Sequence, residues 1–171
     1  MDAAKAAALL FLAVLVQVSV LGAYTPLGGT ADLLLVVLLG VALLRGAVFG
    51  AVAGFGTGLL VDTANLGTLG FTSLLLTVAG FWIGRYGETT ARDRAHAPYV
   101  SVGVVTVLYA FGALVLRFVL GDSVPAHAVV TGLPAGVLLN LILTWPAYAL
   151  LRRLFPPADA GDRVREVRLL A

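Results

Sequence analysis

The sequence has no cysteine and few charged residues, and both shortages narrow the class of protein that it can encode. Without cysteine there is no disulfide, no thiolate metal site and no indication of a redox compartment. Charged residues make up 12% of the 171-residue chain, whereas 60% of it is hydrophobic and the mean hydropathy is +1.03. This balance is far from that of a soluble globular domain and predicts an all-α polytopic membrane protein.

Catalytic and metal-binding patterns are also missing from the sequence. It contains no Ser-His-Asp set, HExxH or Walker loop, and no span holds a pair of acids. The two histidines, His96 and His127, fall in different loops on opposite predicted sides, which argues against a shared metal site. The net charge of +2 argues against nucleic-acid binding. We therefore expect a protein that is not an enzyme and that has no catalytic residue, cofactor or metal.

The apolar stretch at residues 33–61 organises the chain. It begins after Asp32, ends before Asp62 and is interrupted only by Arg45. A single helix of this length would measure about 43 Å against a hydrocarbon core of about 30 Å. It would also hold Arg45 near the bilayer centre, at a cost of roughly 3 kcal/mol or more. We therefore predict two short helices that form a hairpin broken at Arg45-Gly46, with both aspartates at the opposite membrane face.

The distribution of basic residues predicts the topology. With six crossings and both termini in the cytoplasm, ten of the eleven basic residues lie inside, whereas the three outer loops hold only acidic charges. Besides the hairpin, the expected spans cover residues 3–21, 71–84, 98–120 and 129–151. This arrangement gives a six-helix transmembrane domain at 1–155 and a short cytoplasmic tail at 156–171, as a surface helix or as disordered chain.

Glycine recurs at every fourth position in the second half of the hairpin, which places a strip of small residues along one helix face. The strip either packs inside the bundle or docks a helix of another subunit. Arg45 is either a topology anchor or a contact to a partner, and Asp62 either faces water or contacts a partner. The candidate partner interface is Arg45, Gly46, Gly50, Gly54, Gly58 and Asp62.

Three further polar side chains fall within predicted spans. Gln17 and Asn140 lie in mid-span, where amides usually form hydrogen bonds between helices, and the alternative is a ligand contact in a central cavity. Arg117 lies near the outer end of its span. It can extend to the interface, or it can pair with Asp122 or Asp32.

Several of these positions together resemble the bacterial rod shape-determining protein MreD family. The matching positions are Leu44-Arg45-Gly46, Gly50, Gly54, Gly58-Leu59-Leu60-Val61-Asp62 and Leu69-Gly70. The resemblance covers about residues 3–155. In that family a proline often stands just before the first aspartate, where this chain has Ala31.

The resemblance implies a non-enzymatic scaffold of the cell-wall elongation complex in the bacterial inner membrane. Its partners would be the single-span protein MreC and, directly or through it, RodA, the penicillin-binding partner of RodA, and MreB. The family's layout is also similar to the substrate-binding S components of energy-coupling-factor vitamin transporters, which supplies an alternative function. A scaffold predicts a filled bundle centre, whereas an S component predicts a roomy pocket lined by Gln17, Asn140 or loop aromatics.

Overall fold

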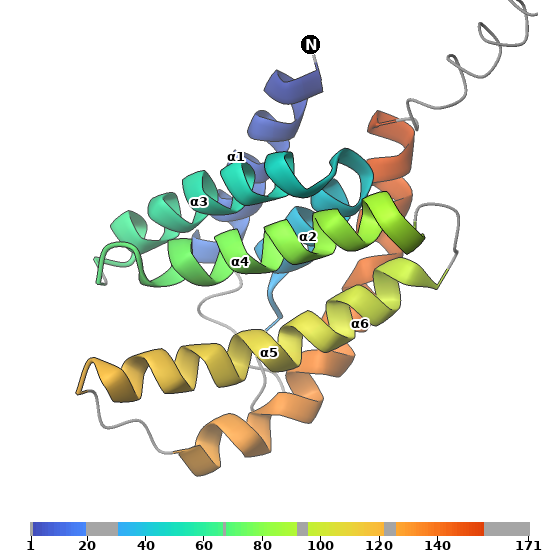
Figure 1. The fold of residues 1–171 in the computed structure, drawn as a ribbon. Coiled ribbons are helices and arrows are strands. Elements are labelled where there is room, and N and C mark those ends of the chain that lie inside the picture. Colours follow the sequence, from blue (N-terminus) through green and yellow to red (C-terminus); the bar gives the residue numbers. More distant parts are fainter. Residues whose placement is uncertain (1, 20–30, 67, 92–95, 122–125, 156–171) are drawn as a thin grey trace, which may run out of the picture.

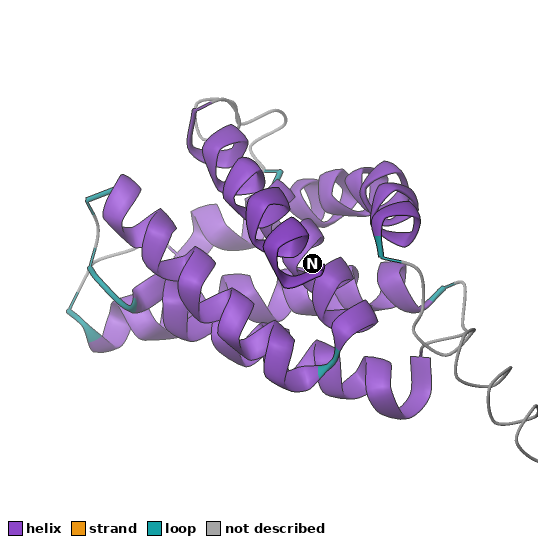
Figure 2. Cartoon of the chain, turned by 90° about the horizontal axis from the view of Figure 1, so that it is seen from above, coloured by secondary structure: helices purple, strands orange, loops and turns teal. Residues whose placement is uncertain are grey.

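The computed structural model describes residues 2–19, 31–66, 68–91, 96–121 and 126–155, and this part of the chain is helical apart from short connections (Figures 1 and 2). The all-α prediction is confirmed for these residues. The elements are α1 (Asp2–Ser19), α2 (Leu33–Arg45), α3 (Ala47–Ala64), α4 (Phe71–Tyr86), the π-helical turn η3 (Gly87–Ala91), α5 (Ala97–Val119) and α6 (Ala126–Leu154).

The long apolar stretch is divided into two helices at Gly46. Helix α2 ends at Arg45, α3 begins at Ala47, and Gly46 between them has a φ of 92°. This backbone conformation costs glycine little because glycine has no Cβ. The start of α2 and the end of α3 line the same cavity, so the two helices run antiparallel. The predicted break at Arg45-Gly46 is therefore present, and the crossing of the bilayer by both helices stays a prediction.

Helix α2 forms the centre of the molecule. Every residue from Leu34 to Leu43 is buried, and α2 contacts each of the other helices and η3. In Figure 1 it lies behind α3 and α4. A helix that is apolar on all sides is expected in a core rather than at a surface, and α2 carries no charge before Arg45.

The outer helices expose apolar surface to their surroundings. Within the described ranges, three helices are long and apolar enough to cross a membrane, namely α3, α5 and residues 129–154 of α6. Helices α1 and α2 are apolar but shorter. Large apolar side chains such as Val48 on α3 and Trp145 on α6 are more than two-thirds exposed, which suits contact with lipid rather than with water. A count of six crossings stays a prediction.

The helices differ from the expected spans mainly at their ends. Helix α3 continues past residue 61 to Ala64, so Asp62 lies in its last turn rather than after it. Helix α6 includes Pro134 and Pro146 and extends beyond the expected span at both ends. The tail at 156–171 lies outside the described residues, and the domain boundary there stays a prediction.

Candidate functional site

The glycine strip of α3 packs directly on the backbone of α4. Each of Gly50, Gly54 and Gly58 is buried, and a Cβ on any of them would lie within 3.0 Å of α4 backbone atoms. At Gly54 these atoms include the Leu76 carbonyl carbon at 2.6 Å and the Thr77 nitrogen at 2.9 Å. Real Cβ atoms do not approach other atoms so closely, so only glycine allows this contact.

Helix α4 contributes glycines to the same contact from its own side. A Cβ on Gly80 would meet the backbone of Gly50, and a Cβ on Gly84 would meet Gly46 and Ala47. By contrast, Gly56 on the opposite face of α3 has nothing within 4 Å of its Cβ position. We call the paired glycine surfaces of α3 and α4 the glycine seam. Figure 1 shows the two helices side by side along this seam.

Of the two roles that the sequence left open for the strip, the structure shows packing inside the bundle. Among all helix pairs, α3 and α4 make the most extensive contact. A partner helix could reach Gly50, Gly54 or Gly58 only by displacing α4. The seam therefore holds two helices of this chain together, and a role of these glycines in docking a partner stays a prediction.

Asp62 closes the far end of the seam, where it contacts the backbone of α4, and its contact with a partner stays a prediction. Its side chain is only 4% exposed, so it does not face water. Its carboxylate oxygens accept hydrogen bonds from the backbone N–H groups of Gly70 at 2.9 Å, Thr72 at 3.0 Å and Ser73 at 3.4 Å. Helix α4 has Gly70 as its N-cap and no side-chain cap of its own. Asp62 therefore supplies the cap, and its charge favours the helix N-terminus.

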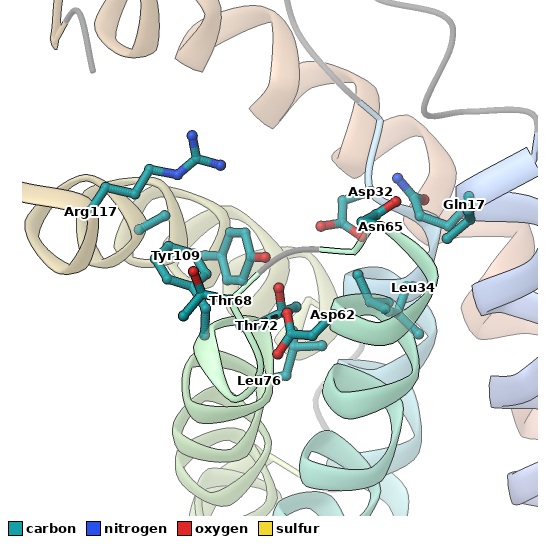
Figure 3. Close-up of a pocket in the computed structure, with 14 residues that line it drawn as sticks. Gln17, Asp32, Leu34, Asp62, Asn65, Thr68, Thr72, Leu76, Tyr109 and Arg117 are labelled. Atoms are coloured by element: carbon teal, nitrogen blue, oxygen red, sulfur yellow. Dashed lines mark hydrogen bonds between the residues drawn. The ribbon is translucent and has the colours of Figure 1, made fainter. Parts of the chain in front are cut away.

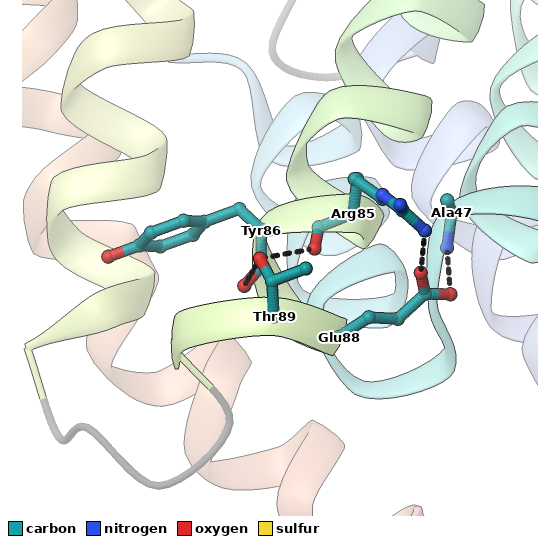
Figure 4. Close-up of polar contacts among 5 residues, drawn as sticks. All are labelled: Ala47, Arg85, Tyr86, Glu88 and Thr89. Atoms are coloured by element: carbon teal, nitrogen blue, oxygen red, sulfur yellow. Dashed lines mark hydrogen bonds and ion pairs between the residues drawn. The ribbon is translucent and has the colours of Figure 1, made fainter.

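A second acidic residue performs the corresponding task at the other end of the seam. Gly46 cannot cap α3, and the Ala47 N–H donates instead to Glu88 Oε1 at 2.9 Å. Figure 4 shows Glu88 reaching from η3 to Ala47, with its other oxygen 3.6 Å from Arg85. Both groups of that ion pair are substantially exposed, so it adds little stability. The hydrogen bond to α3 is the structural contact.

Arg45 lies near this end and packs on the end of α6. Its guanidinium carbon is 5.0 Å from the centroid of the Phe155 ring, and Phe155 is buried. A cation over an aromatic face is attracted by the ring, by about 0.5–2 kcal/mol depending on solvation. Arg45 thus ties the end of α2 to the end of α6, which agrees with an anchoring role. Whether it also contacts a partner stays a prediction.

The two mid-span amides hold the start of α2. Gln17 of α1 donates to the Ala31 carbonyl at 3.1 Å and accepts from the Leu33 N–H at 2.8 Å. Asn140 of α6 accepts from the Asp32 N–H at 2.7 Å and donates to Thr106 at 3.1 Å. Of the two roles expected for these amides, hydrogen bonding between helices is the one that the contacts show.

A polar cavity of about 500 Å³ opens beside this network, between the ends of α1, α3 and α5 and the starts of α2 and α4. Figure 3 shows the Asp32 carboxylate and the Arg117 guanidinium on two sides of it, with Tyr109 between them. Arg117 stands over the Phe71 ring at 5.6 Å, and its predicted pairing with Asp32 is not formed among the described ion pairs. Asp122, the other predicted partner, lies outside the described residues.

Asp32 combines a structural and an electrostatic role in this cavity. Its Oδ1 caps α2 by accepting from the Leu35 N–H at 2.9 Å. Burial raises the pKa of the Asp32 carboxyl, and the Leu35 hydrogen bond opposes that shift. Among the described residues, Oδ2 has no hydrogen-bond partner. One oxygen is therefore available to whatever occupies the cavity.

An apolar groove of about 590 Å³ separates α4 from α5 on the outside of the bundle. Its walls carry large apolar side chains at four-residue spacing, which are largely exposed. On α4 they are Leu74, Val78 and Trp82, and on α5 they are Val100, Val104 and Leu108. Four-residue spacing forms the ridges between which another helix packs. Tyr109 borders both this groove and the polar cavity.

Two functional contributions were not expected from the sequence. Glu88 was not singled out, because the helix start that it caps lies 41 residues before it in the chain. Tyr109 was not singled out, because a tyrosine within an apolar span carries no local sign of what it faces. Within the described ranges, no group of three His, Asp or Glu side chains is placed to hold a metal ion.

Together the buried apolar α2, the lipid-suited outer faces and the glycine seam define a helical multi-pass membrane protein. Polar contacts lie at the ends of its helices, but the described residues form no recognisable catalytic set. The family model of the rod shape-determining protein MreD matches residues 6–154, and the chain belongs to this family. No curated protein and no solved structure matches the chain.

Proposed function

We propose that this chain is a non-enzymatic scaffold of the cell-wall elongation complex, and that it maintains rod shape by docking partner membrane proteins such as MreC. Membership of the MreD family supports a role in rod shape determination. The proposed location is the bacterial inner membrane, with both termini in the cytoplasm. RodA, its penicillin-binding partner and MreB are the further partners, contacted directly or through MreC.

The observation that carries the docking proposal is the apolar groove between α4 and α5. The occupant that we propose is the single transmembrane helix of MreC. Both walls present apolar side chains at helix-packing intervals, and the α4 wall runs for about three turns, from Leu74 to Tyr86. The glycine seam fixes the other side of α4 to α3, so this wall keeps its position when a helix packs against it.

Docking in the groove would not depend on the hydrophobic effect, because lipid tails are as apolar as the groove. It would depend on the fit of side chains, and on the small residues that allow a close approach. Ala79 and Ser101 lie on the groove walls between the larger side chains. They leave room for ridges of the incoming helix, which is the fit that ridge-and-groove packing needs.

Site-specific photocrosslinking tests the proposed surface. A crosslinking amino acid at Val78 or Val104 in the groove should capture MreC in cells. The same residue at Val52 of α3 or Ile142 of α6 should capture little, although these valine and isoleucine side chains are at least as exposed. Capture from the α3 and α6 positions in preference to the groove would overturn the proposed surface.

A substitution that fills the groove gives a second test. Val104→Trp places a bulky ring between α4 and α5, and retention of MreC during purification should fall roughly fivefold or more, since overpacking costs about 1–3 kcal/mol. Ile142→Trp, on an outward face of α6, is the matched control and should retain MreC as the unmodified chain does. Full retention by Val104→Trp with a folded protein would refute docking in this groove.

The alternative function, a substrate-binding S component of a vitamin transporter, draws support from the polar cavity. The cavity does include Gln17, but Asn140 does not line it, and both amides already have partners in the chain. Family membership favours the scaffold. The S-component alternative requires vitamin uptake that depends on this chain, and normal uptake after its deletion, together with loss of rod shape, would exclude it.

A further inference from the structure

The polar cavity at the start of α2 contains opposite charges that do not pair with one another. Asp32 enters it from α2 and Arg117 enters it from α5, and no ion pair between them is formed. The Arg117 guanidinium stands over the face of the Phe71 ring at 5.6 Å. Asp32 is half-buried and Arg117 is exposed, and both side chains border the same cavity. The cavity between them has room for a molecule that carries one group of each charge.

Asp62, the other carboxylate that lines the cavity, differs from Asp32 in its hydrogen bonding. Both oxygens of Asp62 are occupied by backbone N–H groups at the start of α4. Asp62 therefore supports the cavity wall and has little capacity for a ligand. Asp32 uses only Oδ1 for its helix cap, and Oδ2 has no partner among the described residues. Oδ2 of Asp32 is thus the carboxylate oxygen of the cavity lining that accepts no hydrogen bond from the described residues.

The remaining lining suits a small organic molecule. The volume of about 500 Å³ falls within the range of about 300–1,000 Å³ that is typical of ligand pockets. Phe71 and Leu76 provide apolar wall, while Tyr109 and Thr72 provide hydroxyl groups that are bonded to each other and can each accept a further hydrogen bond. An apolar wall with a few converging polar groups is the usual composition of a binding site.

We propose that this cavity binds a small amphoteric molecule, with its ammonium group at Asp32 and its anionic group at Arg117. The Tyr109 hydroxyl, which Figure 3 places between the two charges, faces the middle of the bound molecule. The class of ligand is that of amino acids, ω-amino acids and short peptides. A molecule with only one charge would leave Asp32 or Arg117 unpaired, so it binds more weakly. This site goes beyond the scaffold function, which needs no small ligand.

The test uses the full-length protein in lipid nanodiscs and probes with a graded separation of charges. The probes are 4-aminobutyrate, 6-aminohexanoate, 8-aminooctanoate and the peptide trialanine, and the single-charge controls are hexylamine and hexanoate. Binding is measured by equilibrium dialysis and by the shift in unfolding temperature. At least one amphoteric probe should bind, and it should bind roughly tenfold or more tightly than either single-charge control.

Two charge variants and one matched pair of volume variants assign the binding to the cavity. Asp32→Asn keeps the helix cap, since asparagine caps as well as aspartate, but it removes the charge. It should weaken binding about tenfold or more, as should Arg117→Gln. Ala113→Leu, which fills the cavity, should abolish binding, whereas Ala110→Leu on the same helix does not line the cavity and should leave it unchanged.

Three results would overturn the proposal. They are no binding by any amphoteric probe, binding that all the cavity variants leave intact, and equal binding of the single-charge controls. The last result would indicate that the cavity binds ligands through apolar contacts and does not distinguish them by their charges. MreC retention is measured in the same preparations. A failure of ligand binding with MreC still retained would reject this site alone and leave the docking proposal standing.

Discussion

Adding a single methyl group to the glycine seam should destabilise the fold by an amount that can be worked out from the structure. In Gly54→Ala the new Cβ would stand 2.6 Å from the Leu76 carbonyl carbon, whereas ordinary contact begins at 3.4 Å. Both helices present backbone here, so no flexible side chain can move aside. The seam has to open by on the order of 1 Å, which forfeits a quarter to a half of the dispersion energy of the contacts that separate. Overpacking of this kind costs about 1–3 kcal/mol.

A matched control removes the effect of helix propensity. Alanine is about 1 kcal/mol better than glycine inside a helix, and this gain offsets part of the cost at Gly54. Gly56→Ala gives the same gain on the same helix, two residues away, where the Cβ meets nothing within 4 Å. The difference between the two variants therefore isolates the steric cost of about 1–3 kcal/mol.

The assay is thermal unfolding of both variants in the same detergent. For a chain of this size, 1 kcal/mol corresponds to about 2–4 °C, so Gly54→Ala should unfold roughly 2–12 °C below Gly56→Ala. Equal unfolding temperatures would show that α3 and α4 do not touch through these glycines. The reasoning about the seam, and about the rigidity of the groove wall, would then be refuted.

Substitutions at three other residues test the polar contacts, each by the unfolding temperature. Asp62→Asn should destabilise the fold by about 1–3 kcal/mol, because one amide oxygen cannot replace two carboxylate oxygens that accept three N–H bonds; an unchanged temperature would exclude the capping role. Glu88→Gln should leave the stability nearly unchanged, whereas Glu88→Ala should lower it by about 1 kcal/mol, because only alanine removes the acceptor for the Ala47 N–H. Equal losses of stability in the two variants would indicate that the exposed ion pair with Arg85 matters instead. Asn140→Leu should lose about 1–3 kcal/mol by leaving the Asp32 N–H unpaired, and a neutral result would mean that water replaces the amide.

The helix break at Gly46 could be predicted from the sequence because its causes are local. A charge in the middle of an apolar run and a following glycine lie next to each other, and both disfavour a continuous membrane helix. The glycine spacing also indicated a close helix contact correctly. It could not identify α4 as the neighbour, because a strip of small residues carries no information about what packs on it.

The roles of the acidic residues could not be predicted, because their partners are distant or lie in the backbone. Asp62 binds N–H groups that every residue possesses, so no residue type marks its partners. Glu88 caps a helix whose start is 41 residues away, and Asn140 binds a backbone N–H 108 residues away. Such pairings follow from the packing of whole helices. The convergence of Asp32, Tyr109 and Arg117 on one cavity has the same origin.

The enclosure of α2 bears on how the bundle assembles. Most of the helices that surround α2 follow it in the chain, so α2 would enter the bilayer before its neighbours exist. Its leucine and valine side chains have a similar free energy among lipid tails and in the protein interior. Moving α2 from lipid into the bundle therefore supplies little driving force for assembly. What selects the enclosed position is the set of anchors at its two termini, to Gln17 and Asn140 at one end and to Phe155 at the other. The most apolar segment of the molecule thus depends on polar and aromatic contacts for its final place.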